Sequence, residues 1–232
     1  IHREYAPTLK SVATAGQPRF EYDPSTDGQS IAKGILIESQ ATNILPNGAT
    51  GYNPSNSFSW GTVNGNRVQN AAIAPTGLLE ATHFYEDSTA TSQQRIDVAV
   101  NVSAAVHTFS GYFKSAGRDN VIVRVANGGN TYGAQYTFST ETAANYGTAF
   151  SSLSISGAGN GWYRFTATTP TLTAGSTTIY INLSNGSLNY DGDGYSGVLF
   201  YGLQFEANSF ASSLIATSGG AATRASESLS VA

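Results

Sequence analysis

The sequence predicts an all-β protein, and more narrowly an antiparallel β-sandwich of the jelly-roll type with an extended N-terminal arm and a C-terminal tail. Apolar and polar residues alternate along much of the chain, as they do in half-buried strands, while helical spacing is nearly absent. Turn signals rich in glycine and asparagine separate the alternating segments. Short strands at close spacing, without helices between them, are typical of a sandwich.

Composition divides the chain into three segments. Residues 1–30 contain three of the seven prolines and little alternation, so we expect an extended arm or linker there. Residues 31–210 carry the strand patterns and form the predicted sandwich domain. Residues 211–232 are rich in serine, alanine and threonine, which predicts a tail or a second linker.

Three segments show the alternation of half-buried strands. Residues 95–102, 162–167 and 178–184 each place apolar side chains on one face and mostly polar side chains on the other. We therefore expect one face of each strand to line the core and the other to meet solvent.

Other segments are apolar on both faces. They are residues 35–37, 121–125 and 198–201. Such runs indicate strands in the middle of a sheet or strands covered on both sides. We expect the strand that ends at Glu38 to pair with the strand that ends at Glu206, because jelly rolls usually bring their first and last strands together.

Composition also excludes several classes of function. The net charge of −4 argues against a nucleic-acid partner, which needs basic side chains opposite its phosphates. No apolar run approaches the roughly 18 residues of a membrane span, so no membrane partner is expected. The chain has no cysteine, which excludes disulfides and cysteine-bound metals. Charged residues make up only 11% of the chain. A coat of Ser, Thr, Asn and Gly suits an extracellular surface and contact with sugar hydroxyls.

No catalytic motif is visible, so neither an enzyme activity nor catalytic residues are expected. The histidines, His2, His83 and His107, do not pair at the spacing of metal ligands. Residues 194–197 are one residue short of a serine nucleophile elbow.

Two glutamates at strand ends are the most suggestive carboxylates. A glycosidase needs two facing carboxyl groups, and Glu38 and Glu206 each end an apolar strand. The favoured interpretation is structural. In it, both carboxylates accept hydrogen bonds from nearby backbone or from Arg19 or Arg224.

One acidic loop begins like a calcium site. Asp191 and Asp193 are two residues apart, but Gly202 stands where an EF-hand loop needs its final glutamate. A turn between strands is the favoured interpretation. A structural calcium ion held together with acids from elsewhere stays open, and no other cofactor is expected.

Aromatic residues in loop-like or polar-flanked positions are the candidates for ligand contact. They are Trp60, Tyr132, Tyr136 and Tyr146. Aromatic rings stack on the C–H faces of sugars while polar groups bind the hydroxyls, which is the mixed lining of many ligand sites. We expect some of these four to bind glycan.

A set of different short motifs follows one after another over residues 19–224. They are Arg-x-x-Tyr-Asp at Arg19, Tyr22 and Asp23, the apolar strand ending in Glu38, Thr-Asn at Asn43, Gly-Asn-Gly-Trp-Tyr-Arg at 159–164, Gln-Phe-Glu at Gln204 and Glu206, and Arg224. The ordered set resembles a β-sandwich module of bacteriophage tail-fibre and head-spike proteins, similar to concanavalin-type or carbohydrate-binding jelly rolls. The chain departs from that pattern at residues 212–217, which replace a stretch richer in Tyr and Pro.

The resemblance implies a module on the virion surface that binds host bacterial polysaccharide, expected to be neutral or weakly charged. It implies other virion proteins as partners and a homo-oligomer, most simply a trimer held through residues before Arg19. The signature residues are implied to be architectural. The alternative is a purely structural virion component, such as a head fibre or capsid decoration protein. A polysaccharide depolymerase is a more distant one.

Overall fold

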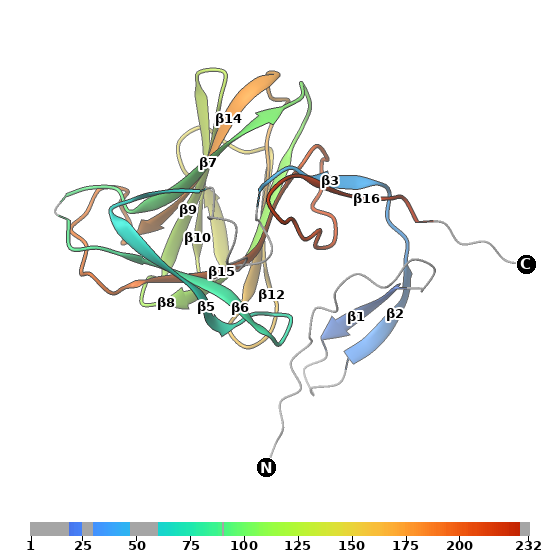
Figure 1. The fold of residues 1–232 in the computed structure, drawn as a ribbon, viewed down its shortest axis with the longest axis horizontal. Helices are drawn as coiled ribbons and strands as arrows, with labels where there is room; N and C mark the ends of the chain where they lie inside the picture. Colours follow the sequence, from blue (N-terminus) through green and yellow to red (C-terminus); the bar gives the residue numbers. More distant parts are fainter. Residues whose placement is uncertain (1–18, 25–29, 47–59, 90, 228–232) are drawn as a thin grey trace, which may run out of the picture.

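The computed structural model describes residues 19–24, 30–46, 60–89 and 91–227, and the regular structure in these segments is all β-strand (Figure 1). The strands are β1 (Arg19–Pro24), β2 (Ser30–Leu36), β3 (Ala41–Asn43), β4 (Gly61–Val63), β5 (Gly65–Ile73), β6 (Leu79–Glu86), β7 (Arg95–Val102), β8 (Thr108–Ala116), β9 (Asn120–Asn127), β10 (Asn130–Thr137), β11 (Thr142–Asn145), β12 (Ser152–Gly157), β13 (Tyr163–Thr168), β14 (Gly175–Ser184), β15 (Gly197–Glu206) and β16 (Ala222–Arg224). None of the described segments holds a helix that is long and apolar enough to cross a membrane.

Two large antiparallel sheets face each other across one core. The six-stranded sheet has the order β11-β10-β9-β14-β7-β4. The eight-stranded sheet has the order β12-β13-β8-β15-β3-β16, with β6 also pairing with β15 and β5 pairing with β6. The predicted all-β sandwich of the jelly-roll type is therefore confirmed.

The predicted alternation produces this core directly. In β7, Ile96 points inward and is fully buried, while its neighbours Arg95 and Asp97 are partly exposed. In β14, Ile179 and Ile181 are buried in the same way. Each large apolar side chain of this kind contributes about 1.5–3 kcal/mol to stability when it leaves water.

Phenylalanine rings from the eight-stranded sheet fill the opposite half of the core. They include Phe84, Phe109, Phe113, Phe165 and Phe205, all without exposed surface. The ring of Phe165 stacks on Phe113 with 4.8 Å between centroids and on Tyr136, from the other sheet, with 4.1 Å. Stacked pairs add about 0.5–1.5 kcal/mol beyond the area they bury.

The outer face of the eight-stranded sheet is covered by the chain itself. Tyr112 and Tyr201 form a second apolar cluster there with Trp162. The turn between β5 and β6 lies over them, because Ala81 belongs to the same cluster and the indole nitrogen of Trp162 donates a hydrogen bond to the carbonyl oxygen of Ile73 at 3.2 Å. This cover explains why β15 is apolar on both faces.

The expected pairing of the strands before Glu38 and Glu206 is wrong. The strand before Glu38 is β2, which pairs with β1 in a separate two-stranded sheet. The next strand, β3, pairs with β15 instead, where Asn43 lies opposite Glu206. Residues 37–40 have no regular structure and separate β2 from β3, so the partner of β15 comes one strand later than the apolar run predicts.

The structure places strands on both sides of the predicted domain boundaries. The expected tail of residues 211–232 is integrated into the sandwich as far as the structure describes it, because β16 pairs with β3 along Ala222–Arg224. The expected arm of residues 1–30 contains β1, which forms a hairpin with β2. Residues 1–18, the expected inter-chain contact, lie outside the described residues. Figure 1 shows β3 and β16 side by side at one flank of the sandwich, close to where the β1–β2 hairpin begins.

Candidate functional site

Three of the four predicted glycan-binding aromatics are core residues. Trp60 is 3% exposed, Tyr132 9% and Tyr136 0%, so none of them offers a ring face to a ligand. The side-chain polar atoms of Trp60 and Tyr136 form hydrogen bonds inside the protein. The Trp60 indole donates to the carbonyl of Pro46 at 3.2 Å, and the Tyr136 hydroxyl donates to the carbonyl of Thr166 at 2.6 Å. Thr131, Gln135 and Thr137, the polar neighbours of Tyr132 and Tyr136, are at least partly exposed, so these two inward positions resemble surface positions in the sequence.

The fourth aromatic, Tyr146, lies at the edge of the six-stranded sheet and is partly exposed. Its backbone nitrogen donates a hydrogen bond to the carbonyl of Gly133 in β10 at 2.8 Å. A side chain at position 133 would come within 2.1 Å of the Tyr146 carbonyl oxygen, so only glycine allows this approach. Tyr146 is therefore held beside the outer face of the sheet.

That outer face carries a group of polar and aromatic side chains. Tyr180 of β14 lies between Asp97 of β7 and Arg124 of β9 in the strand register. Arg95 and Asn182 form the next row of the same face. We call this set, together with Gln93, the platform: Gln93, Arg95, Asp97, Arg124, Tyr180 and Asn182.

Tyr180 is the centre of the platform. The guanidinium carbon of Arg124 lies 4.9 Å from the centroid of the Tyr180 ring, and that of Arg95 lies 5.5 Å from it. Both distances are those of cation–π contacts. The ring therefore orients the two arginine side chains and restricts their rotamers.

Hydrogen bonds complete the platform. Arg124 donates from Nε to Asn182 Oδ1 at 3.2 Å, and Arg95 donates from Nε to Asp97 Oδ1 at 3.2 Å. Gln93 Oε1 accepts from Arg124 Nη2 at 2.9 Å and from Arg95 Nη1 at 3.3 Å. Burial and then the nearby charge of Arg95 lower the pKa of Arg124, while Tyr180 and Tyr146 act in the opposite direction. An arginine nevertheless stays protonated at neutral pH.

The arrangement is suited to binding. It combines aromatic surface, guanidinium donors, amide groups and one carboxylate on one sheet face. A single carboxylate does not make the pair that a glycosidase needs. The sequence contained a signal for it, since Arg95, Asp97, Tyr180 and Asn182 occupy outward positions of two predicted strands. Sequence reasoning missed the site because nothing in the chain shows that β7, β14 and β9 are neighbours.

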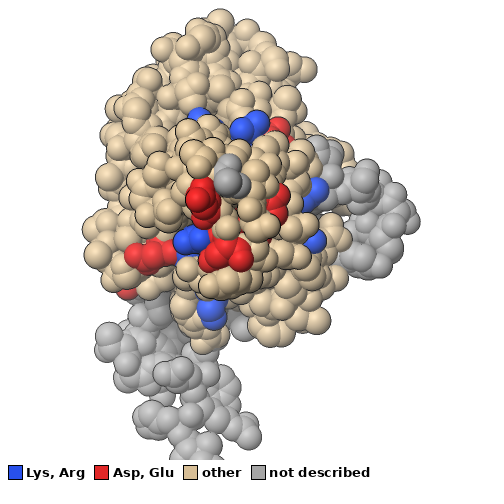
Figure 2. Space-filling view, turned by 90° about the vertical axis from the view of Figure 1, so that its left-hand side faces the viewer, with Lys and Arg blue, Asp and Glu red and all other residues tan. Residues whose placement is uncertain are grey.

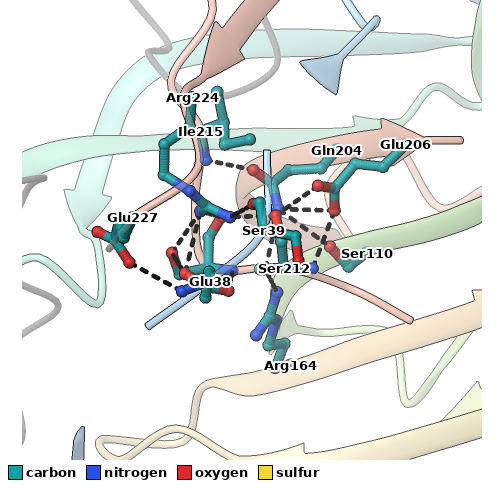
Figure 3. Close-up of polar contacts among 11 residues, drawn as sticks. Glu38, Ser39, Ser110, Arg164, Gln204, Glu206, Ser212, Ile215, Arg224 and Glu227 are labelled. Carbon is teal, nitrogen blue, oxygen red and sulfur yellow. Dashed lines mark hydrogen bonds and ion pairs between the residues drawn. The ribbon is translucent and has the colours of Figure 1, made fainter. Parts of the chain in front are cut away.

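The predicted architectural residues form a second, buried group where the incoming and outgoing segments meet (Figure 3). Glu38 accepts hydrogen bonds from the backbone nitrogen of Ser213 at 2.8 Å and from its hydroxyl at 2.5 Å, and it forms an ion pair with Arg224 at 3.1 Å. Glu206 is fully buried and accepts from the backbone nitrogen of Ser212 at 3.1 Å and from its hydroxyl. Both carboxylates thus accept the backbone hydrogen bonds expected of a structural role. Burial raises the pKa of Glu206, and the bonds from Ser212 only partly offset this.

We call this buried group, in which Glu38, Glu206, Ser212, Ser213 and Arg224 meet, the junction. Amide side chains extend it. Asn43 donates from Nδ2 to the carbonyls of Leu203 at 3.0 Å and Ile215 at 3.1 Å, and its Oδ1 accepts from the Phe205 nitrogen at 3.1 Å. Gln204 accepts a hydrogen bond from the backbone nitrogen of Ile215. These contacts tie β3, β15 and the segment after β15 together.

Three further signature residues stay untested, because the side chains of Arg19, Tyr22 and Asp23 lie outside the described residues.

The acidic loop at Asp191 and Asp193 is built as a turn. Asp191 Oδ1 accepts from the backbone nitrogen of Thr91 at 2.5 Å and from its hydroxyl at 2.9 Å, and these bonds lower the pKa of Asp191. Asp193 accepts from the backbone nitrogen of Ser196 at 2.7 Å and pairs with Arg118 at 3.2 Å. Burial raises the pKa of Asp193, but the hydrogen bonds from Ser196 outweigh it and the net pKa is lowered.

Basic side chains lie close to the acids of this loop. Figure 2 looks onto this end of the sandwich and shows basic side chains between the acidic ones. Within the described residues, no group of three or more His, Asp or Glu side chains could hold a metal ion. The guanidinium of Arg118 already supplies positive charge beside Asp193.

TmCBM61 is among the solved structures that are similar to this fold. TmCBM61 in complex with β-1,4-galactotriose is similar over 72% of this chain and 99% of that chain, with 12% sequence identity and a TM-score of 0.43. No family model and no curated protein matches the sequence. Likeness at that level carries no argument about the ligand, so the functional case rests on the platform itself.

Proposed function

We propose that this protein binds a glycan through the platform and Tyr146, without catalysis, as a surface module of a bacteriophage fibre or spike. The observation that supports the binding role is the contrast between the two sheets. The outer face of the eight-stranded sheet is covered by its own chain. The outer face of the six-stranded sheet presents Tyr180 among guanidinium, amide and carboxylate groups.

The composition supports the same role. With 11% charged residues, the surface consists largely of hydroxyl and amide groups that match sugar hydroxyls. A single shallow site of this kind binds weakly, in the range of about −4 to −8 kcal/mol or millimolar to micromolar. Repetition of the module in a fibre would raise the effective affinity. The virion location is supported by the motif resemblance alone.

The proposal of binding without catalysis is supported by the fate of the two candidate carboxylates. Glu38 and Glu206 hold the backbone and hydroxyl groups of Ser213 and Ser212, and Glu38 also pairs with Arg224. Carboxylates committed in this way serve the junction between segments, and a glycosidase pair would instead face an open cleft.

Substitution of the platform aromatics tests the binding role. Tyr180→Ala and Tyr146→Ala should each reduce retention of the full chain on a glycan array by about tenfold or more, because stacking area and oriented donors are lost. Tyr195→Ala is the matched control, since Tyr195 is 72% exposed, lies in the loop before β15 and is not one of the platform residues. Equal losses in all three variants, or none in the first two, would place the ligand elsewhere.

A purely structural virion component is the second candidate. The observation that favours it is the buried junction, which fixes the segments entering and leaving the domain to one another. In that case the wild-type chain would show no retention on any host polysaccharide, even when presented multivalently.

A further inference from the structure

We propose that the glycan bound by the platform is acidic, and that Arg95 and Arg124 bind its carboxylate or sulfate group. This inference rests on the proposed function and specifies the ligand class of the same site. It departs from the neutral or weakly charged polysaccharide expected from composition.

The charges of the platform do not balance. It contains two guanidinium groups and one carboxylate, and that carboxylate, Asp97, is paired with Arg95 at 3.2 Å. Arg124 bonds only to the neutral amide oxygens of Asn182 and Gln93. In the described part of the chain, Arg124 has no acidic partner. A partly buried cation with neutral partners gains more from an arriving anion than a fully solvated one does.

The two arginines also converge. Arg124 Nη2 and Arg95 Nη1 donate to the same oxygen, Gln93 Oε1, at 2.9 and 3.3 Å. Both guanidinium groups lie within 5.5 Å of the centroid of one ring, that of Tyr180. Two cations held this close repel each other, and the lowered pKa of Arg124, caused first by burial and then by Arg95, agrees with that geometry. An anion between them would relieve the repulsion.

Donors remain available for such an anion. Arg124 Nη1 and Arg95 Nη2 donate no hydrogen bond to any residue that the structure describes. Guanidinium groups bind carboxylate and other oxyanions through paired N–H donors, and orientation by the Tyr180 ring reduces the entropy lost on binding. A neutral sugar could accept these hydrogen bonds but would leave the charge uncompensated.

The net charge of the protein does not assist binding of an acidic polymer. The chain carries a net charge of −4, so an acidic polymer is repelled by the protein as a whole. Attraction at the platform must therefore come from the arginines themselves, and removing one of them should abolish it.

The experiment measures retention of the full chain in affinity gels that contain defined polysaccharides. Polygalacturonate, alginate and polysialate supply carboxylates, and each is matched with its carboxyl-reduced form. Carrageenan supplies sulfate esters without carboxylates and is matched with its desulfated form. Together these arms identify which acidic group is bound.

The variants are chosen to separate site-specific binding from general charge. Arg124→Gln and Arg95→Gln remove one platform cation each, and Arg124→Lys keeps the charge without the paired donors. Lys114→Gln is the charge-matched control, because Lys114 lies in β8 of the other sheet and donates to the Asn160 carbonyl at 2.7 Å. Thermal unfolding of each variant confirms that it is folded.

We expect at least one acidic polymer to bind the wild type about tenfold more tightly than its neutral form. Arg124→Gln and Arg95→Gln should lose that preference, Arg124→Lys should keep part of it, and Lys114→Gln should keep all of it. Equal binding of acidic and neutral polymers, lost in Tyr180→Ala, would overturn the acidic ligand and leave the proposed function standing. Preference that survives Arg124→Gln would overturn the assignment to the arginines. Absence of binding to every polymer would overturn both proposals.

Discussion

At the residue scale, one contact recurs in this charge-poor protein. A carboxylate accepts both the backbone N–H and the hydroxyl of a single serine or threonine. The pairs are Glu38 with Ser213, Asp119 with Ser139, Asp191 with Thr91 and Glu206 with Ser212. Hydrogen bonds to charged acceptors contribute about 1.5–3 kcal/mol each. Serine and threonine thus take the place that basic side chains hold in more highly charged proteins.

Glu206 gives this contact a measurable pH dependence. Burial raises its pKa above the ordinary value of 4.5. A raised pKa means that the folded state favours the protonated form of Glu206. The contribution of that form to the free energy of unfolding is complete below the ordinary pKa of the group, and it is lost as pH rises through the pKa in the folded state. Glu206→Gln cannot ionise. We therefore expect the stability advantage of wild type over Glu206→Gln to be largest below pH 4.5 and to shrink toward neutral pH.

Urea unfolding at a series of pH values measures this difference. Glu141→Gln is the control, because Glu141 is exposed and accepts a hydrogen bond from the Tyr163 hydroxyl at 3.1 Å. A wild-type advantage that stays constant with pH, or grows as pH rises, would contradict the raised pKa of Glu206.

At the element scale, the C-terminal segment after β15 packs into the sandwich and stabilises it. Its buried residues include Ser212, Ile215, Thr217 and Arg224. A chain that ends at residue 210 would leave the buried polar groups of Asn43, Gln204 and Glu206 without these partners. Each buried group left unsatisfied costs about 1–3 kcal/mol. We expect that truncation to lower the free energy of unfolding by several kcal/mol or to prevent folding.

Chemical denaturation of two shortened chains tests this point. A chain that ends at residue 227 keeps β16 and the whole junction, so its midpoint should match that of the full chain. If the chain ending at residue 210 were equally stable, the segment after β15 would be a free tail after all.

Several strands could be predicted from sequence, and their partners could not. Alternation placed β7 and β14 and showed which faces are buried, because that signal is local. The pairing of β15 with β3 depends on contacts across most of the chain, and an apolar run such as that before Glu38 is compatible with several partners. The platform could not be predicted from sequence either, because it depends on the pairing of β14 with β7 and β9. Tyr136 and Tyr132 were misread because an inward aromatic and an exposed aromatic have similar neighbours in sequence.

At the scale of the whole molecule, we propose a homo-oligomer, most simply a trimer, in which each copy presents one platform. Cyclic symmetry lets one surface patch serve every subunit. Residues 1–18 are the first candidate for the contact. The turn between β5 and β6 is a second, because Ile73, Leu78 and Leu79 are 55%, 59% and 56% exposed.

Light scattering of the intact protein should give the mass of three chains. Deletion of residues 1–18 and the double change Leu78→Asp with Leu79→Asp test the two contacts separately, and the variant that yields a monomer identifies the interface. A monomeric intact protein at all concentrations would refute the oligomer.

The junction has a mechanical consequence. Glu38 and Glu227 are joined by two hydrogen bonds, one from the Glu227 backbone nitrogen to the Glu38 carbonyl at 3.0 Å and one from the Glu38 backbone nitrogen to the Glu227 side-chain carboxylate at 2.9 Å. A pull on the two flanking segments therefore falls first on this point and then on the antiparallel β3–β16 pair, whose bonds open one after another from the same end. In the proposed fibre, tension would pass through the base of the module, and the six-stranded sheet that carries the platform would bear none of it until the β3–β16 pair had opened.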